Sequence, residues 1–119
     1  MTYDSSNIFA KILRGEIPCK KVYEDKYVLA FHDIAPHAPV HILVLPKNAY
    51  TGMDDFTKRG STEEIAALFR ALGDIARLQG LDKTGYRVIS NCGPDSEGEV
   101  PHLHLHLLGG KKLGKLLAA

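Results

Sequence analysis

The chain has 119 residues, the size of one domain, and 45% of them are hydrophobic, which is enough for one core. The 15 Lys and Arg residues nearly balance the 14 Asp and Glu residues, giving a formal net charge of +1. This balance excludes the broad basic surface of a duplex nucleic-acid binder. No apolar run approaches the roughly 18 residues of a membrane span, and polar residues interrupt any signal peptide. We therefore expect a cytoplasmic protein with no nucleic-acid or membrane partner.

Two smaller features of the composition also limit the function. Cys19 and Cys92 are too few for a disulfide framework and form no CxxC pair. The only local excess of charge is Lys111, Lys112 and Lys115, near the end of the chain. We interpret these lysines as part of a solvated tail, with an anion-binding role as the alternative.

The first half of the chain predicts one short helix and three strands. An apolar stripe behind a polar N-cap indicates a helix over residues 8–13. A β-hairpin follows, with strands over residues 21–24 and 27–34. A third strand over residues 40–45 is apolar on both sides except at His41, which predicts a central position in the sheet.

The second half predicts a longer helix and two more strands. Polar residues 51–61 indicate a loop, and helical spacing of apolar residues then indicates a helix over residues 62–79. Strands over residues 86–91 and 100–108 enclose the turn-rich segment 92–99. The order of elements favours an α+β fold with a five-stranded antiparallel sheet and two helices.

All six histidines fall in two short windows, residues 32–41 and 102–106. Alternate residues of a strand face the same side, so His102, His104 and His106 should share one face while the intervening leucines face a helix. Three imidazoles in a row add little apolar burial and little strand propensity. A purely structural role therefore explains this pattern poorly.

Two functional explanations remain open from the residues alone. A metal ion could be bound by two histidines of the strand with His41 as a third ligand, although no Cys or carboxylate lies nearby at ligand spacing. Alternatively, a neutral imidazole could attack phosphorus and form a phosphohistidine, while its neighbours fix its tautomer and donate protons. The glycines of the segment 92–99 could then expose backbone N–H groups to a phosphate, or serve only as a connection.

The heptad HLHLHLL at residues 102–108 resembles the signature of the histidine triad (HIT) superfamily, in which histidines alternate with hydrophobic residues. Further segments are similar to the Hint branch, the histidine triad nucleotide-binding proteins: residues 8–9, 11–12, 14–18, 23–25, 30–34, 38–39 and 41–47. Residues 108–110 and 113–114 are similar to its bacterial members. The resemblance covers nearly the whole chain, so we expect one HIT domain over residues 1–119 with a tail at 111–119.

This resemblance implies a homodimer whose two five-stranded sheets join, with the tail reaching the partner's site. It implies a pocket for a purine nucleoside monophosphate, AMP or GMP, and hydrolysis of nucleoside phosphoramidates. The implied nucleophile is His104, surrounded by His102, His106 and His41. No cofactor is required, and any bound zinc would be adventitious.

The resemblance also implies a set of nucleotide-binding residues. Asp33 would accept hydrogen bonds from the ribose hydroxyls, and Asn91 would lie near the phosphate or the reacting histidine. The base would lie in an apolar slot formed by Ile8, Phe9, Ile12, Phe31 and Ile34. Backbone amides of Gly98, Glu99 and Val100 would bind the phosphate oxygens.

One segment departs from the family pattern. Hint members usually carry Gly-Gln-x-Val before the first histidine, whereas this chain has Glu97-Gly98-Glu99-Val100, with Pro101 in place of an aromatic residue. Without gaps, Glu97 replaces the Gly and Gly98 the Gln; shifted by one residue, Glu99 replaces the Gln. Either alignment removes an amide donor and puts an acid near the phosphate. Two alternatives therefore stay open, a dinucleoside polyphosphate hydrolase of the Fhit type and a nucleotide-binding module with little turnover.

Overall fold

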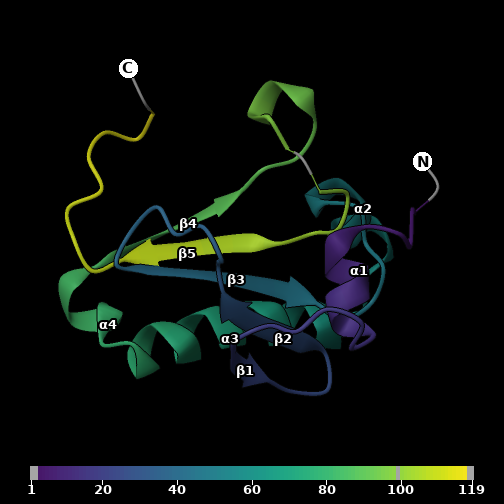
Figure 1. The fold of residues 1–119 in the computed structure, drawn as a ribbon, viewed down its shortest axis with the longest axis horizontal. Coiled ribbons are helices and arrows are strands. Elements are labelled where there is room, and N and C mark those ends of the chain that lie inside the picture. Colours follow the sequence, from purple (N-terminus) through teal and green to yellow (C-terminus); the bar gives the residue numbers. More distant parts are fainter. Residues whose placement is uncertain (1–2, 99, 118–119) are drawn as a thin grey trace.

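The computed structural model describes residues 3–98 and 100–117, and its centre is one antiparallel sheet (Figure 1). The elements are, in chain order, α1 Ile8–Leu13, β1 Lys21–Glu24, β2 Val28–His32, β3 Val40–Pro46, α2 Met53–Arg59, α3 Thr62–Leu78, α4 Leu81–Thr84, β4 Tyr86–Ser90, the 3-10 turn η1 Pro94–Ser96 and β5 Leu105–Gly109. The predicted α+β class and the five-stranded antiparallel sheet are confirmed.

The strand order is β1-β2-β3-β5-β4, so β3 is the central strand, as its apolar pattern predicts. The last strand, β5, pairs with β3 on one side and with β4 on the other. In this register Leu43 lies opposite His106, and His41 lies opposite Leu108. The sheet therefore brings the two histidine windows of the sequence together.

One face of the sheet is covered by α3. Leu68, Leu72 and Ile75 of this helix are buried against Leu105 and Leu107 of β5, together with apolar residues of β2 and β3. The prediction that the leucines between the histidines face a helix is thus confirmed. The opposite face carries a smaller cluster around Phe9, Leu29, Phe31, Leu43 and Leu45. Among the described helices only the short α1 packs on this cluster, with Cys19 and Val100 beside it, so this face keeps room for a pocket.

The predicted fifth strand over residues 100–108 is wrong at its beginning, since β5 starts at Leu105. Pro101 has no N–H to give to a strand ladder. The next two amides bond elsewhere, because His102 N–H donates to Val100 O (2.9 Å) and Leu103 N–H donates to Tyr50 O (2.8 Å). The first triad histidine therefore lies outside the regular strand.

The prediction of a loop at residues 51–61 and of only two helices is also wrong. The loop contains α2, whose first turn is acidic, whose last turn is basic and whose Phe56 is buried. The acidic first turn and the basic last turn complement the helix dipole, and the buried Phe56 ring holds the helix on the core. A further short helix, α4, follows Gly80, which has a left-handed φ of 74°.

The ends of the described chain contribute little to the core. Arg87 donates to Gly114 O (3.0 Å) and Lys115 O (3.2 Å), which holds the segment after β5 near β4. The three lysines of this segment are exposed, and both cysteines are free thiols. Within the described ranges, no helix combines the length and the hydropathy required to cross a bilayer.

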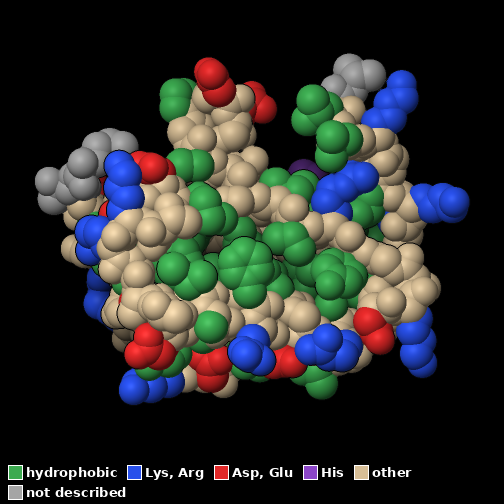
Figure 2. All heavy atoms as spheres, turned by 180° about the vertical axis from the view of Figure 1, so that it is seen from behind, with side chains coloured by type: hydrophobic (Ala, Val, Ile, Leu, Met, Phe, Trp, Pro, Cys, Tyr) green, Lys and Arg blue, Asp and Glu red, His purple; other side chains and the backbone are tan. Residues whose placement is uncertain are grey.

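Several large hydrophobic side chains remain exposed on α3 and β4. Phe69 and Leu78 of α3 are 62% and 69% exposed, and Tyr86 and Val88 of β4 are 44% and 40% exposed. Val88 lies opposite Leu107, so it projects to the sheet face that α3 covers. Figure 2 shows hydrophobic side chains gathered across the middle of the molecule's rear side.

Candidate active site

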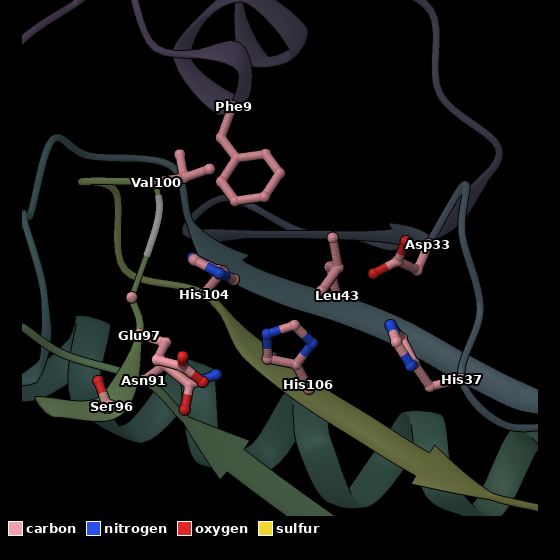
Figure 3. Close-up of a pocket in the computed structure, with 11 residues that line it drawn as sticks. Phe9, Asp33, His37, Leu43, Asn91, Ser96, Glu97, Val100, His104 and His106 are labelled. Carbon is pink, nitrogen blue, oxygen red and sulfur yellow. The ribbon is translucent and has the colours of Figure 1, made fainter. Parts of the chain in front are cut away.

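A pocket of about 480 Å³ opens on the sheet face opposite α3 (Figure 3). It is formed by α1, the end of β2, the strands β3 and β5, and the loop between β4 and β5. The lining residues are Phe9, Asp33, His37, Leu43, Asn91, Ser96, Glu97, Gly98, Val100, His104 and His106. His106 of β5 and His104, which directly precedes this strand, thus face a cavity large enough for a small molecule.

The structure brings together seven of the residues that the sequence suggests for the site: Phe9, Asp33, Asn91, Gly98, Val100, His104 and His106. His41 and His102 are buried directly behind this lining. Glu99 lies outside the described residues.

The suggested apolar base slot is only partly assembled. Phe31 is buried behind Phe9, at 6.0 Å between ring centres, and does not line the pocket. Ile34 is fully exposed, Ile8 is about half exposed, and Ile12 lines a separate cavity beside β1. In this chain, therefore, Phe9, Leu43 and Val100 provide the apolar wall of the pocket.

The environment of His104 fixes its tautomer. His104 Nδ1 lies 2.7 Å from the carbonyl oxygen of His102, and a carbonyl can only accept, so Nδ1 carries the proton. Nε2 is left with its lone pair. The ring packs edge-on against Phe9, with 4.7 Å between centres, and burial lowers the pKa of His104. His104 is therefore a neutral imidazole with a nucleophilic nitrogen.

A second set of contacts fixes His41 and His106. The backbone N–H of His37 donates to His41 Nδ1 (3.0 Å), so the proton of neutral His41 is on Nε2. This Nε2–H donates to His106 Nδ1 (2.9 Å), and the proton of neutral His106 is then on its own Nε2. Burial, with the nearby His104 and His41, lowers the pKa of His106 to about 4. His106 thus lines the pocket as a hydrogen-bond donor.

His102 has a different role from the other two triad histidines. Its ring is 1% exposed, and its Nε2–H donates to Pro46 O (2.8 Å). The hydroxyl of Tyr3 then donates to its Nδ1. Both ring nitrogens are occupied, and burial lowers the pKa of His102. Its ring anchors the segment whose carbonyl orients His104.

Asp33 lies just past the end of β2, at the pocket wall next to His41. One carboxylate oxygen accepts from the backbone N–H of Ala35 (2.8 Å), and the other lies 3.4 Å from His41 Nε2. Donor atoms of Asp33, His41 and His106 all lie within 4.8 Å of one another in the described structure. Two imidazoles and a carboxylate are a donor set that suits zinc.

The loop before β5 is tightly closed on itself. Gly93 O accepts hydrogen bonds from Ser96 N–H (3.3 Å) and Gly98 N–H (3.2 Å). Glu97 has a left-handed φ of 58°, a conformation that favours glycine. This conformation supports the ungapped alignment, in which Glu97 occupies the family's glycine position. The N–H of Gly98 is used within the loop, so in this structure it does not face a phosphate.

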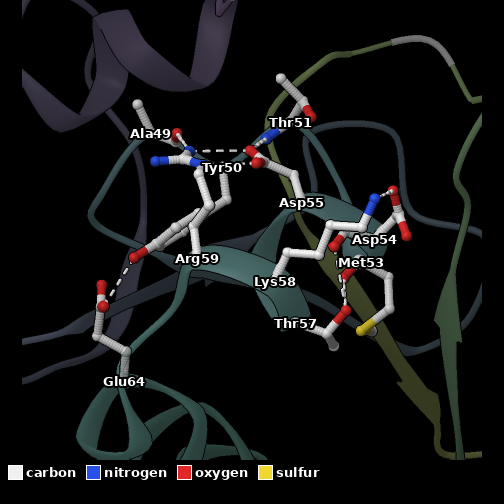
Figure 4. Close-up of polar contacts among 10 residues, drawn as sticks. All are labelled: Ala49, Tyr50, Thr51, Met53, Asp54, Asp55, Thr57, Lys58, Arg59 and Glu64. Carbon is white, nitrogen blue, oxygen red and sulfur yellow. Dashed lines mark hydrogen bonds and ion pairs between the residues drawn. The ribbon is translucent and has the colours of Figure 1, made fainter. Parts of the chain in front are cut away.

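A buried carboxylate at the start of α3 supports the histidine segment from behind. Glu64 accepts from Tyr50 O–H (2.7 Å), from Asn48 Nδ2 (2.8 Å) and from Ser61 N–H (3.0 Å), and Figure 4 shows its contact with Tyr50. Burial alone would raise the pKa of Glu64, but these hydrogen bonds outweigh it and the pKa is lowered. Because Tyr50 O also accepts from Leu103 N–H, this network holds the chain between His102 and His104.

Sequence reasoning missed four contributors to this site. His37, Leu43 and Ser96 line the pocket, and Tyr3 contacts His102. His37 lies in the first histidine window, which was its only sequence signal. Its backbone N–H contact with His41 depends on the loop geometry, and the contact of Tyr3 joins residues far apart in the chain.

Comparison with known proteins decides the family. The family model described as HIT domain matches residues 14–113. The chain belongs to the HIT family. This HIT protein is 60% identical over 116 residues to an uncharacterized 13.2 kDa HIT-like protein of Azospirillum brasilense, covering 98% of this chain and 95% of the relative.

Two further relatives place this HIT protein in the Hint-like branch. The purine nucleoside phosphoramidase of Escherichia coli K12 is 40% identical over 111 residues, which cover 93% of this chain and 92% of that protein. The solved structure of a histidine triad protein from Clostridium difficile has a TM-score of 0.85 and 45% identity, and covers 98% of this chain and 100% of that one. The HIT fold expected from the sequence is thereby confirmed.

Proposed function

We propose that this HIT protein is a hydrolase that cleaves the P–N bond of purine nucleoside 5′-phosphoramidates. The observation that carries the proposal is the fixed tautomer of His104, whose Nε2 lone pair is available in a pocket that also holds the His106 donor. The relationship to a purine nucleoside phosphoramidase of Escherichia coli supports this substrate class.

Residues in different parts of the pocket position the base and the ribose of the substrate. Its base packs against the apolar wall of Phe9, Leu43 and Val100, and its ribose hydroxyls donate to Asp33. The α-phosphorus then lies between His104 and His106. The anionic phosphoryl group raises the pKa of His106 from its low ligand-free value, because a nearby negative charge stabilises the imidazolium. In the imidazolium Nδ1 also carries a proton, so His41 Nε2–H donates to Asp33, whose carboxylate oxygen lies 3.4 Å away, in place of His106.

Two displacements at phosphorus complete the reaction. His104 Nε2 forms a bond to the α-phosphorus while the P–N bond breaks, and protonated His106 gives its Nε2 proton to the leaving nitrogen. The products are a nucleotidyl-histidine and a free amine. Water then attacks the phosphorus, His106 accepts a proton from it, and the nucleoside monophosphate leaves with both histidines restored.

Amine release tests this proposal. An AMP phosphoramidate with a fluorescent amine is incubated with wild type, His104→Ala and His32→Ala. Removal of the nucleophile should lower kcat/KM by about 10⁴-fold or more. His32 is exposed and outside the pocket lining, so His32→Ala should match wild type. An active His104→Ala variant would refute the assigned nucleophile.

The same assay separates the two alternatives from the proposal. Faster cleavage of a dinucleoside polyphosphate than of the phosphoramidate would indicate an Fhit-type hydrolase. AMP binding without amine release would indicate a nucleotide-binding module.

A second candidate function is zinc binding, favoured by the donor set of Asp33, His41 and His106. The reaction proposed above uses only protons and imidazoles and requires no cofactor. Stoichiometric zinc in protein purified without chelator, together with loss of activity when EDTA removes it, would favour the second candidate. Full activity in EDTA is the expected result.

We further propose that the protein acts in the cytoplasm as a homodimer. The apolar side chains of α3 and β4 support the assembly. Tyr86 and Val88 are exposed on β4, an edge strand that has no neighbour on its outer side among the described residues, and Phe69 and Leu78 are exposed on α3. A second copy would cover both the apolar side chains and the strand edge.

A further inference from the structure

Glu97 is held in place at one end of the pocket. Its N–H donates to Pro94 O (3.0 Å), and both neighbouring amides donate to Gly93 O. A Cβ at Gly98 would lie 3.3 Å from Gly93 N, so the loop is closely packed at this point. The position of the Glu97 side chain is thus set by the loop backbone, although the carboxylate itself is exposed.

The pocket has a one-sided charge. Its lining contains the carboxylates of Asp33 and Glu97 but no Lys or Arg among the described residues. Across residues 3–98 and 100–117, Glu97 takes part in none of the seven ion pairs. A negative charge on a ligand near Glu97 would therefore be repelled, and a positive charge would be attracted.

The two carboxylates lie at different ends of the bound substrate. Figure 3 shows Asp33 and His37 at one end of the pocket and Glu97 and Asn91 at the other, with His106 between them. With the ribose at Asp33 and the phosphorus beside the histidines, the substrate atoms beyond phosphorus extend toward Glu97. These atoms are the leaving group.

We propose that Glu97 is a specificity-determining residue that favours leaving amines carrying an additional positive charge, such as a diamine, and disfavours leaving groups with a carboxylate or phosphate. This inference rests on the proposed phosphoramidate hydrolysis. It names the substrate class more narrowly as nucleoside phosphoramidates of cationic amines.

Three AMP phosphoramidates test the inference. Their leaving amines have equal length and end in an ammonium, a hydroxyl or a carboxylate group. Wild type should give a kcat/KM at least about tenfold higher for the ammonium than for the carboxylate substrate, the size of a charge interaction at a partly solvated site. The ratio should fall as salt is raised, because salt screens exposed charges.

The decisive variant is Glu97→Gln, in which the ammonium-to-carboxylate ratio should fall about tenfold toward one. Because the ratio is taken within each variant, any change that affects all substrates equally cancels. The matched control is Asp95→Asn, an exposed acid of the same loop that does not line the pocket, and it should keep the wild-type ratio. Glu97→Gly tests the residue that the family usually carries there and should behave like Glu97→Gln.

The outcomes separate this inference from the proposed function. Hydrolysis with an unchanged ratio in Glu97→Gln overturns the role of Glu97 and leaves the hydrolase intact. If wild type cleaves none of the three compounds, the hydrolase proposal fails. The dissociation constants of the ammonium and carboxylate compounds are then measured by calorimetry for wild type and Glu97→Gln. If the ratio of the two constants is the same in both proteins, the inference is again overturned.

Discussion

At the scale of single residues, backbone groups determine which nitrogen of each histidine carries the proton. The carbonyls of His102 and Pro46 bind ring N–H groups, and the N–H of His37 binds a ring lone pair. Backbone amides do not titrate near neutral pH, so these partners keep the same donor or acceptor character throughout a reaction cycle. The reactivity of His104 therefore depends on the chain path as much as on neighbouring side chains.

Tyr3 supplies a side-chain contact to His102 and does not line the pocket. Tyr3→Phe leaves the buried Nδ1 of His102 without a donor, so the free energy of unfolding should fall by about 1–3 kcal/mol. Denaturant unfolding measures this change. The control Tyr27→Phe, whose ring faces the Lys26 ammonium, should change it by less than about 0.5 kcal/mol. Equal stability of Tyr3→Phe and wild type would contradict the assigned contact.

The buried histidines should also make the protein sensitive to mild acid. The pKa values of His102, His104 and His106 lie below the ordinary value in the folded protein, so below about pH 6.5 the unfolded chain binds more protons. Their stabilisation is present above pH 6.5 and is lost as the pH falls toward 4. As the pH falls from 7 toward 5, His106, with its pKa of about 4, should contribute a slope approaching about 1.4 kcal/mol per pH unit, and His102 and His104 should add to it. Unfolding free energies that stay constant over this range would contradict the neutral state of the buried histidines.

At the scale of elements, β5 begins only at Leu105. His102 therefore lies before the strand and anchors the chain, while His104 and His106 line the pocket. Alternation along a strand correctly predicted that His104 and His106 face one side, but the strand was predicted to begin too early, and His102 lies before β5. The failure has a physical cause, since Pro101 cannot join a ladder and Leu103 bonds to Tyr50 from a distant part of the chain. Local patterns contain no information about such a partner.

Ser61 and Glu64 form a capping box at the start of α3, and Glu64 also binds Tyr50, the partner of Leu103. Glu64→Gln can keep one oxygen for Tyr50 O–H and Ser61 N–H, which share Oε1, but it puts an amide N–H in place of Oε2, against the Asn48 Nδ2 donor. We expect the free energy of unfolding to fall by about 1–3 kcal/mol. Glu63→Gln, on the exposed side of the same turn, is the matched control and should stay within about 0.5 kcal/mol of wild type. Two variants of equal stability would show that the network does not support the segment.

At the scale of the whole molecule, α3 packs across β1, β2 and β3 and leaves the β4 side of the sheet with exposed apolar side chains. Val88→Lys introduces a charge there and should shift the proposed dimer toward monomer. Light scattering after size-exclusion chromatography measures the mass. Thr57→Lys, an exposed position on α2, should leave the mass unchanged. A wild-type protein that is monomeric at micromolar concentration would refute the dimer.

The fold as a whole was largely predictable from the sequence, and the pocket was predictable only in part. The hydrophobic periodicity predicted the sheet and the long helix, because both elements form by burying their apolar residues in the core. Asp33 and Asn91 were predicted through the family resemblance, and His104 and His106 through their alternation and the resemblance. The adjacent strands β2, β3, β5 and β4 bring all four to one face. Ile8 and Ile34 are apolar but exposed, since a stripe of apolar residues does not say what covers it.

The stereochemical course at phosphorus distinguishes a reaction through His104 from direct attack by water. A nucleoside phosphoramidate made chiral at the α-phosphorus by sulfur substitution is hydrolysed by wild type in isotopically labelled water. Attack by His104 followed by attack by water gives two in-line displacements, so we expect overall retention of configuration. Inversion would mean that water attacks the substrate directly, and it would contradict the nucleotidyl-histidine on His104.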